Sequence, residues 1–247
     1  MISTAVVALI AASGLALGSY AVTAGLRVSR LEVTTLGRSH CDACGRSLSF
    51  VQTVPVASYL MLKGLCAHCG ARIDPIHLAG ELCGAVVLLA APWGASPLRG
   101  ALVSFMGLAL LASAAVDLKT MRLPDPLTAA IAVAAAALAA THGLAALSAG
   151  VVAAAAATVI MLSVRWTVAR RRGEPGLGLG DVKLTAALAL WLGPATPLMV
   201  AIACGLGLAA APFSRDARGR LPFGPMIAAA GWAAGAALER GWLSWPR

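Results

Sequence analysis

Charge is scarce in this sequence of 247 residues, because Asp, Glu, Lys and Arg together make up only 12% of it. That is about half of their share in an average soluble domain. Hydrophobic residues make up 60% of the chain, and its mean hydropathy is +0.85. So few charges cannot cover a surface that faces water, which excludes a soluble enzyme. Intrinsic disorder is excluded as well, because so apolar a chain buries itself.

The apolar residues are gathered in eight runs. The first run, 2–26, carries no charge and lacks the basic start of a signal peptide, so we expect it to be a retained helix. The other seven are 78–96, 99–117, 126–141, 144–166, 182–194, 197–213 and 222–238. A membrane span takes about 20 residues. The pattern therefore predicts an all-α polytopic membrane protein with about eight transmembrane helices.

Basic residues outnumber acidic ones by 19 to 10, which gives a formal net charge of +9. If both termini lie outside the cytoplasm, 16 of these 19 residues fall in cytoplasmic segments, and only Arg99, Arg240 and Arg247 fall outside. This division follows the positive-inside rule. It predicts a multi-pass protein of the cell membrane with both termini outside the cytoplasm. The excess of basic charge then reflects topology and contact with anionic lipid, and no binding of nucleic acid is expected.

Four of the six cysteines form two Cys-x-x-Cys pairs, Cys41 with Cys44 and Cys66 with Cys69, with 21 residues between the pairs. Each pair is followed by a glycine. Two such turns can hold four thiolates in a tetrahedron around zinc. The charge pattern puts this segment in the cytoplasm, where disulfides are rare. We therefore predict a small zinc-binding domain between the first two membrane helices; the alternative is four free or redox-active thiols without a metal.

Three acidic residues lie at the ends of apolar runs on the predicted cytoplasmic side. Asp117 ends the run 99–117, Asp125 precedes the run 126–141, and Asp181 follows the alternating glycines Gly178 and Gly180. Asp125 and Asp181 have an alternative interpretation as helix-start residues whose side chains accept backbone N–H bonds. A phosphate-binding loop is excluded for the glycine run, because no strand precedes it and the Gly-Lys-Ser/Thr ending is absent.

Asp117 and Asp181 are predicted to lie at the same depth, since both are at cytoplasmic ends of helices. Carboxylates at membrane depth are costly and usually functional. Two neighbouring carboxyls cannot both ionise easily, so one is held protonated while the other is charged. With a water molecule between them, such a pair is typical of an aspartic protease.

These features resemble the bacterial type IV prepilin leader peptidases, which belong to the GxGD class of membrane aspartic proteases. The motifs that carry the resemblance are, in chain order, Gly18-Ser19-Tyr20, the two cysteine pairs, Pro55-Val-Ala-Ser58, Lys63-Gly64-Leu-Cys66, Glu81-Leu82, Asp117 with Leu123-Pro124-Asp125, Gly178-Leu-Gly180-Asp181-Val-Lys183 and Pro222-Phe-Gly-Pro225. The chain departs from the family pattern at Tyr20, which replaces Phe, and at Gln52-Thr53, where the family often has Asn before the proline.

The resemblance implies that Asp117 and Asp181 are the catalytic pair, with Gly178, Gly180, Lys183 and Asp125 in supporting roles. It also implies three parts, namely a first transmembrane helix at 1–26, a cytoplasmic tetracysteine domain at 27–77 and a membrane aspartic peptidase domain at 78–247. The implied substrates are type IV prepilins or pseudopilins, cleaved after a Gly that follows a short basic leader. N-methylation of the new N-terminus by S-adenosylmethionine is implied too, although no residues for binding that cofactor can be identified.

Two other functions fit parts of the pattern. A transporter could use intramembrane acids as a proton relay, but its acids are expected near mid-membrane within inverted repeats, and no repeat is apparent here. A non-enzymatic assembly protein of a pilus or secretion system could use the zinc-binding domain to dock partners. The presence of both Asp117 and Asp181 argues against this second alternative.

Overall fold

The computed structural model describes residues 3–30, 37–93, 96–174, 176–212 and 220–243, and these residues form helices, turns and isolated bridges without a strand. Eight helices are long: α1 (Thr4–Ser29), α3 (Pro75–Ala90), α4 (Pro97–Thr120), α5 (Asp125–Thr141), α6 (Leu144–Arg172), α7 (Leu179–Leu192), α8 (Thr196–Ala210) and α9 (Gly224–Glu239). Three are short: η1 (Val51–Thr53), α2 (Ala57–Met61) and η2 (Gly193–Ala195). The all-α prediction is confirmed for this part of the chain, and each predicted apolar run overlaps one long helix.

Four helical segments of the described chain are long and apolar enough to cross a membrane. They are Thr4–Ser29, Pro97–Thr120, Leu144–Arg172 and Leu179–Ala210, the last of which joins α7, η2 and α8. Helices α3 and α5 are apolar but shorter. The structure therefore supports a polytopic membrane protein, whereas the number of eight spans stays a prediction. Arg215, Arg218 and Arg247, which enter the charge argument, lie outside the described residues.

The chain divides into two compact units, Met1–Ala90 and Ala91–Arg247. Helix α3 belongs to the first unit, where it packs against α1. The domain boundary expected at residue 78 lies inside α3, so the first structural unit extends beyond the predicted cytoplasmic domain. The functional parts expected from the sequence stay predictions.

In the first unit, glycines let α1 and α3 approach each other closely. A Cβ atom added to Gly18 would lie 2.2 Å from the carbonyl oxygen of Gly80, and one added to Gly84 would lie 2.3 Å from that of Gly14. Gly14 and Gly18, like Gly80 and Gly84, are four residues apart and therefore share one helix face. Paired glycines at this spacing are a common contact between helices in lipid, and here they bring the two backbones together.

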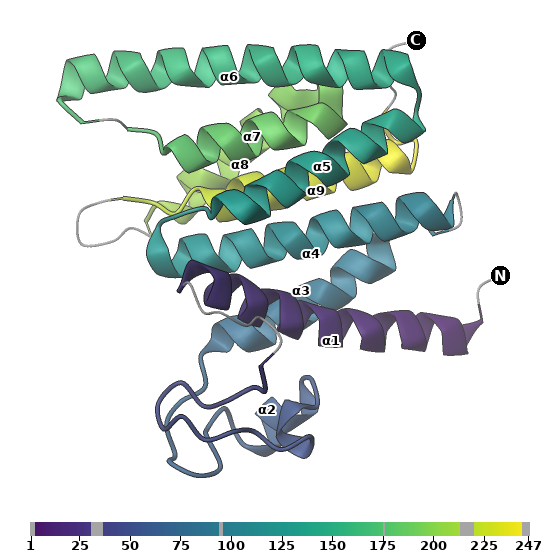
Figure 1. Cartoon of the computed structure of the whole chain (residues 1–247), viewed down its shortest axis with the longest axis vertical. Helices are drawn as coiled ribbons and strands as arrows, with labels where there is room; N and C mark the ends of the chain where they lie inside the picture. Colours follow the sequence, from purple (N-terminus) through teal and green to yellow (C-terminus); the bar gives the residue numbers. More distant parts are fainter. Residues whose placement is uncertain (1–2, 31–36, 94–95, 175, 213–219, 244–247) are drawn as a thin grey trace. The chain divides into compact units, whose positions relative to one another are not determined.

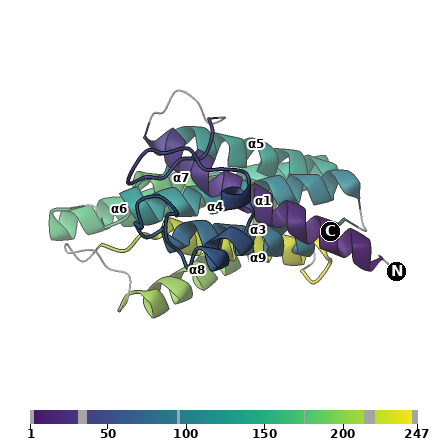
Figure 2. The same ribbon diagram turned by 90° about the horizontal axis from the view of Figure 1, so that it is seen from below.

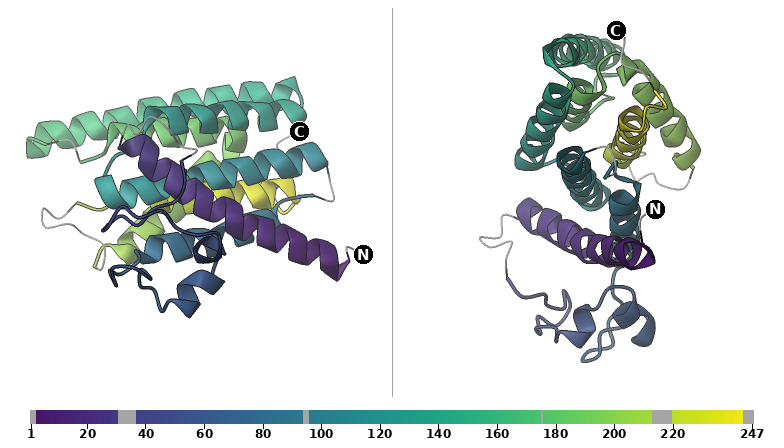
Figure 3. Two further views of the ribbon diagram at one scale, coloured as in Figure 1. Left: turned by 60° about the horizontal axis from the view of Figure 1, so that its bottom comes forward. Right: turned by 90° about the vertical axis from the view of Figure 1, so that its right-hand side faces the viewer.

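In the second unit, six helices α4 to α9 run roughly side by side, as the end-on view in the right panel of Figure 3 makes clear. Helices α7 and α9 are the most enclosed of them, with eight of 14 and ten of 16 residues buried. Glycines on the neighbours of α7 make room for that helix: a Cβ at Gly150 of α6 would lie 2.1 Å from the carbonyl oxygen of Leu190, and one at Gly235 of α9 would lie 2.0 Å from the Trp191 ring. Helix α7 carries Asp181 in its first turn.

Helix α6 lies at the edge of this unit and covers α7 over part of its length (Figure 1). Only Ala146 and Gly150 of its 29 residues are buried. Helix α8 lies beside α9 on another edge (Figure 2). Because so little of the apolar helix α6 is buried within the protein, we expect α6 to face lipid. Its length and composition also suit a membrane span.

The two ends of the second unit carry different polar groups. At one end, the Arg99 guanidinium near the start of α4 donates to the carbonyl oxygen of Thr141 at the end of α5, over 3.0 Å. At that same end, Glu239 accepts from the Trp191 indole at 3.0 Å and lies 2.9 Å from His142 Nε2. The opposite end holds the last turn of α4 and the starts of α5, α7 and α9. Asp117 and Asp181 therefore lie at one end of the unit, as expected.

Candidate active site and metal site

The end of the second unit that holds Asp117 and Asp181 is hollowed by an open cavity of about 1070 Å³. Both aspartates line it, together with Asp125, Gly178, Gly180 and Lys183, so the structure brings the predicted site residues to one place. The cavity wall also includes the side chains Arg122, Leu123, Arg165, Arg172, Glu174, Cys204, Arg220, Leu221 and Phe223. Residues from the ends of several different helices thus converge on one polar cavity.

Asp117 is held by the beginning of α9. The residue is only 5% exposed, and its Oδ2 accepts a hydrogen bond of 2.9 Å from the Gly224 backbone N–H. A Cβ atom at position 224 would lie 2.8 Å from that same Oδ2. The first backbone N–H groups of a helix have no partner within the helix and attract negative charge. The Pro222-Phe-Gly-Pro225 motif therefore fixes one carboxylate oxygen and leaves Oδ1 for other partners.

Asp181 lies in the first turn of α7, and its carboxylate forms a hydrogen bond with the backbone of Gly178. A Cβ atom on Gly178 would lie 3.0 Å from Oδ2 of Asp181, and one on Gly180 would lie 3.0 Å from the Leu123 side chain. Gly178 has an ordinary φ of −68°, so its role is to leave space for the carboxylate and not to adopt a rare conformation. The Gly-x-Gly-Asp sequence thereby brings the backbone close to its own aspartate and to the loop before α5.

The two carboxylates are close enough for their charges to interact, and this repulsion acts on Asp181. Asp117 is buried and Asp181 is partly buried, so water screens this interaction only weakly. The loop that carries the glycines is held in place from outside, because the Arg165 guanidinium on α6 donates to the carbonyl oxygen of Leu177. The site therefore contains two interacting acids on separate helices, each positioned by backbone groups.

Lys183 and Asp125 pair with each other across the starts of α7 and α5, with Nζ of the lysine 2.7 Å from Oδ1 of the aspartate. Both side chains are well exposed, and exposed pairs of this kind contribute less than about 1 kcal/mol. Asp125 is the first residue of α5, directly after the N-cap residue Pro124. Its position at a helix start is as expected, and the choice between a cap and a supporting role stays open.

The four cysteines of the first unit come together in one cluster. Their Sγ atoms all lie within 4.8 Å of one another, and those of Cys41 and Cys69 are 3.8 Å apart. Zinc bound tetrahedrally through Zn–S bonds of about 2.3 Å would separate its sulfurs by about 3.8 Å. His40 and His68 flank the pairs in sequence but are not part of the cluster. These residues could hold a metal ion without a further ligand.

The two cysteine turns have the same backbone geometry. In the first, the Gly45 N–H donates to the carbonyl oxygen of Cys41 at 2.8 Å; in the second, the Gly70 N–H donates to that of Cys66 at 3.0 Å. Both glycines adopt positive φ, +70° and +67°, a conformation that glycine reaches without strain. This explains the glycine after each pair, and it shows two equivalent turns facing one another across the sulfur cluster.

Backbone groups also act on the sulfurs. Hydrogen bonds from the backbone of Cys69 and His68 lower the pKa of the Cys66 thiol to about 6, so the thiolate that binds metals dominates there at neutral pH. At Cys69, a hydrogen bond with the backbone of Ala71 favours the thiolate, but burial and the neighbouring thiols outweigh it and raise the pKa to about 11. Four close sulfurs do not all ionise readily without a cation.

Residue spacing alone does not reveal the importance of Glu81, which stands out in the sequence only as part of the Glu81-Leu82 motif. The residue is 8% exposed; its Oε1 accepts from the Ser19 hydroxyl at 3.0 Å, and its Oε2 accepts from the Val56 N–H at 2.7 Å. Val56 has a positive φ of 61°, which is costly for a β-branched residue. Glu81 therefore ties α1, α2 and α3 together.

This geometry defines a class of protein. It is a helical membrane protein with two interacting carboxylates in one unit and a four-cysteine cluster in another. Two family models match the chain: "Bacterial Peptidase A24 N-terminal domain" over residues 12–95, and "Type IV leader peptidase family" over residues 102–211. Together with the relatives described next, they establish that the chain belongs to the type IV leader peptidase family. No solved structure matches it significantly.

Relatives from several bacteria carry matching names. A "Prepilin leader peptidase/N-methyltransferase" of Burkholderia pseudomallei is 41% identical over 207 residues, or 78% of this chain and 65% of that protein. One of Aeromonas salmonicida is 31% identical over 84% of this chain and 75% of the relative. A "Type 4 prepilin-like proteins leader peptide-processing enzyme" of Escherichia coli is 33% identical over 79% and 74%. The chain thus spans about two thirds to three quarters of these relatives.

The cysteine cluster leads to a prediction about metal content. We expect one metal ion per chain in protein purified without chelator, and we expect Cys66→Ser to lose most of it, because three thiolates hold the ion less well than four. Cys83→Ser is the matched control, since Cys83 is exposed on α3 and lies outside the cluster. Elemental analysis of both variants and the parent checks this. Less than a tenth of an equivalent of metal in the parent protein would contradict the prediction.

Proposed function

We propose that this chain is a membrane aspartic endopeptidase that removes the leader of type IV prepilins or pseudopilins. The observation that carries the proposal is the pair Asp117 and Asp181, which interact electrostatically while lining a single cavity at one end of the second unit. The names of the relatives support the substrate class. We place cleavage after the Gly of the leader at the cytoplasmic face of the cell membrane.

The two carboxyl groups divide the chemistry between them. The ionised aspartate takes a proton from the attacking water, and the protonated aspartate polarises the scissile carbonyl and donates its proton as the tetrahedral intermediate forms. Asp117 is held in place, because the Gly224 N–H donates to its Oδ2. Asp181 directly follows the glycine loop and lines the cavity. Gly178 and Gly180 provide the space for the second acid, while Lys183 and Asp125 join the starts of α7 and α5.

We further propose that the metal of the cysteine cluster is zinc, in a structural role. Four thiolates complete a tetrahedral zinc site and leave no open position for a reacting water. The names of the relatives include an N-methyltransferase, so we propose methylation of the new N-terminus by S-adenosylmethionine as a second activity. The acids lie at one end of their unit, which favours a peptidase over a transporter with acids at mid-membrane.

The central prediction concerns the acid pair. Asp117→Asn and Asp181→Asn should each lower leader cleavage by at least about 10²-fold to 10⁴-fold, because Asn keeps the size of the side chain but cannot exchange the proton. The double variant should be no worse than either single one, since the two groups act as a unit. A leader-cleavage assay on purified, correctly inserted protein provides the measurement.

The Asp125→Asn variant tests whether Asp117 or Asp125 is the catalytic partner of Asp181. We expect it to lower cleavage only a few-fold, because the exposed pair with Lys183 contributes little. Strong cleavage by Asp181→Asn would refute the aspartic-protease mechanism. Loss of activity in Asp125→Asn with an active Asp117→Asn would show that Asp125 is the partner of Asp181. The pH–rate profile of the parent protein should be bell-shaped, with two apparent pKa values that belong to the pair as a whole.

A second prediction tests the support of Asp117 by α9. Gly224→Ala should lower kcat of cleavage about tenfold or more, because the new Cβ would stand 2.8 Å from Oδ2 and displacing a reacting group by about 1 Å can cost 10²-fold. Gly205→Ala is the matched control, since a Cβ at that position of α8 meets no atom within 4 Å. Equal rates for the two variants would contradict this role of Gly224.

The proposed orientation can be measured with reporter fusions. Fusions after His142 and Gly193 should read as extracytoplasmic, and fusions after Gly70, Arg172 and Arg218 should read as cytoplasmic, because most basic residues then lie inside. Arg170 and Trp166 near the end of α6 form a cation–π pair, with 3.9 Å between the guanidinium carbon and the ring centre, which suits a membrane interface. A cytoplasmic signal at His142 would overturn the orientation.

A further inference from the structure

Exposed apolar side chains gather on one segment of the first unit, residues 50–61, which we call the apolar segment. It holds η1, the turn after η1 and α2, and these two short helices contact each other. Phe50 is 84% exposed and Met61 is 75% exposed, and Val51 and Leu60 are exposed as well. Single exposed apolar residues are ordinary on a protein surface. Several of them in one short segment indicate a contact with a partner or a membrane.

The charge around the apolar segment has one sign. Between Asp42 and Asp74 the sequence contains no acidic residue, whereas it contains Arg46, Lys63 and Arg72. All three basic residues are exposed. Apolar side chains flanked by basic ones are typical of segments that lie in the surface of a bilayer with anionic lipids.

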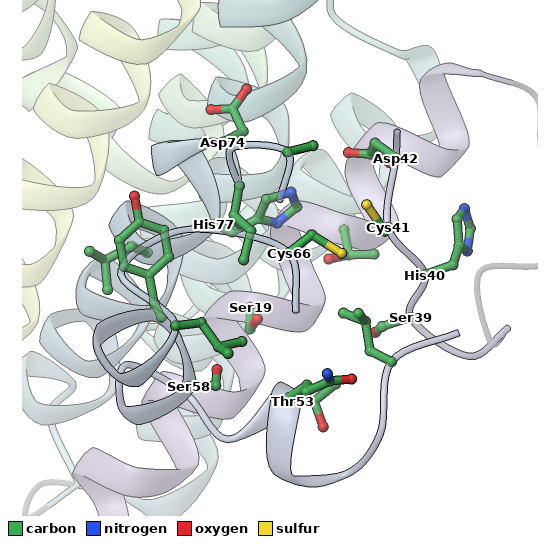
Figure 4. Close-up of a pocket in the computed structure, with 18 of the residues that line it drawn as sticks. Ser19, Ser39, His40, Cys41, Asp42, Thr53, Ser58, Cys66, Asp74 and His77 are labelled. Carbon is green, nitrogen blue, oxygen red and sulfur yellow. The ribbon is translucent and has the colours of Figure 1, made fainter. Parts of the chain in front are cut away.

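Contacts with α1 fix the level of the apolar segment along that helix. The Val56 N–H donates to Glu81, which also accepts from the Ser19 hydroxyl of α1. Ser19 lines one cavity together with Thr53 of η1 and Ser58 of α2 (Figure 4). Helix α1 ends at Ser29, which is about 15 Å beyond Ser19 along the helix axis.

Helix α1 is too short to hold the apolar segment clear of a bilayer. Its 26 residues make it a candidate span and extend over about 39 Å, whereas the hydrocarbon core of a bilayer is about 30 Å thick. No more than about 9 Å of α1 can then lie outside the core on the side where it ends. Ser19 therefore lies at least about 6 Å inside the core, and a tilt of α1 only increases this depth. The segment bonded to it lies at the level of the acyl chains.

The backbone of the apolar segment is suited to that level, because its N–H groups have acceptors within the protein. Those of Ser58, Leu60 and Leu62 donate to carbonyl oxygens of the segment itself. Val56, whose φ is positive, donates to the carboxylate of Glu81. In water a solvent molecule could accept that bond, whereas in hydrocarbon the protein must supply the acceptor. A fixed carboxylate at this turn therefore favours an apolar surrounding.

We propose that the apolar segment is a membrane anchor. Its exposed side chains insert among the acyl chains of the leaflet at which α1 ends, and Arg46 and Lys63 contact anionic headgroups beside its two ends. In the proposed orientation this is the cytoplasmic leaflet. The anchor goes beyond the proposed peptidase and does not depend on it. It holds the cysteine turns against the membrane surface instead of leaving them free in the cytoplasm.

A photoactivatable phospholipid with a diazirine on its acyl chain tests the proposal on the unsubstituted full chain. The chain is placed in nanodiscs of phosphatidylcholine and phosphatidylglycerol that hold one protein molecule each, and labelled peptides are measured by mass spectrometry. Trypsin cuts after Arg46 and Lys63, so peptide 47–63 carries the whole apolar segment, while peptides 39–46 and 64–72 carry the cysteine turns. We expect strong labelling of 47–63 only. Labelling no stronger than that of the two cysteine-turn peptides would overturn the anchor.

A pair of variants tests whether apolar character is the cause. Leu60→Asp combined with Met61→Asp should lower the labelling of peptide 47–63 at least about tenfold, because a carboxylate within hydrocarbon is costly. Leu60→Met combined with Met61→Leu is the matched control, since it exchanges the same two side chains, and it should be labelled like the parent. Both residues are exposed, so the helix content measured by circular dichroism should stay unchanged. Equal labelling of the two variants would overturn the anchor.

Other occupants of the apolar segment predict other results. A segment that binds the helix of a substrate or a second copy of this chain faces water in a nanodisc that holds one chain and no substrate, so an unlabelled 47–63 there would overturn the anchor in favour of a protein partner. Replacing phosphatidylglycerol by phosphatidylcholine should weaken the labelling, because basic residues are drawn to anionic lipid. Equal labelling in both bilayers would overturn the part assigned to Arg46 and Lys63.

Failure of the anchor and failure of the proposed peptidase are distinguishable. The Asp181→Asn variant should be labelled like the parent, because Asp181 belongs to the second unit. A parent protein that cleaves leaders without labelling of 47–63 would overturn the anchor alone. Labelling that responds to the aspartate substitutions, in a protein that cleaves nothing, would support the anchor while refuting the peptidase.

Discussion

The hydrogen bond between the Gly224 N–H and the carboxylate of Asp117 is the contact on which the second unit depends. A carboxylate that is 5% exposed in an apolar bundle needs a fixed partner, and here the partner is the start of a helix that is distant in sequence. The bond brings the beginning of α9 to the end of α4 at 2.9 Å. It also requires glycine at position 224, because a side chain there would occupy the carboxylate's place.

Glycines allow close helix packing in both units. Gly18 and Gly84 bring α1 against α3, while Gly150 and Gly235 make room for α7. In lipid, helices gain little from the hydrophobic effect when they associate, so close packing and a few polar contacts carry the association. The glycines thus determine which helices touch. The buried acids Asp117 and Glu239 then join helix ends, and Glu81 joins the middle of α3 to α1 and to Val56.

The sequence was sufficient to predict the helices and the convergence of the site residues. The apolar runs and the glycine before Asp181 are local signals, and alternation of charge along the chain placed Asp117 and Asp181 at one end. The role of Gly224 could not be predicted from residue spacing, since its partner is 107 positions away. The ion pair between Asp125 and Lys183 could not be predicted for a similar reason, since the two residues come from different helices.

Glu81 and α3 illustrate a second limit of structure prediction from sequence. An acidic residue within an apolar run looks interfacial when only its neighbours in sequence are considered, but its partners Ser19 and Val56 come from two other segments. Likewise, α3 resembles the other apolar runs, and only its packing against α1 assigns it to the first unit. The composition of a segment reveals that its helix is apolar. Which helices it packs against depends on how the surfaces of the folded helices fit together.

The contact among His142, Trp191 and Glu239 gives the second unit a mechanical asymmetry. The ends of α5, α7 and α9 meet at this one carboxylate, whose side chain is fully enclosed, and separating them would expose an ionisable group to an apolar surrounding. The opposite ends of the same three helices border an open cavity. The three helices are therefore fastened together at one end by a single carboxylate, whereas at the other end α7 carries Asp181 beside open space and α9 is joined to Asp117 of α4.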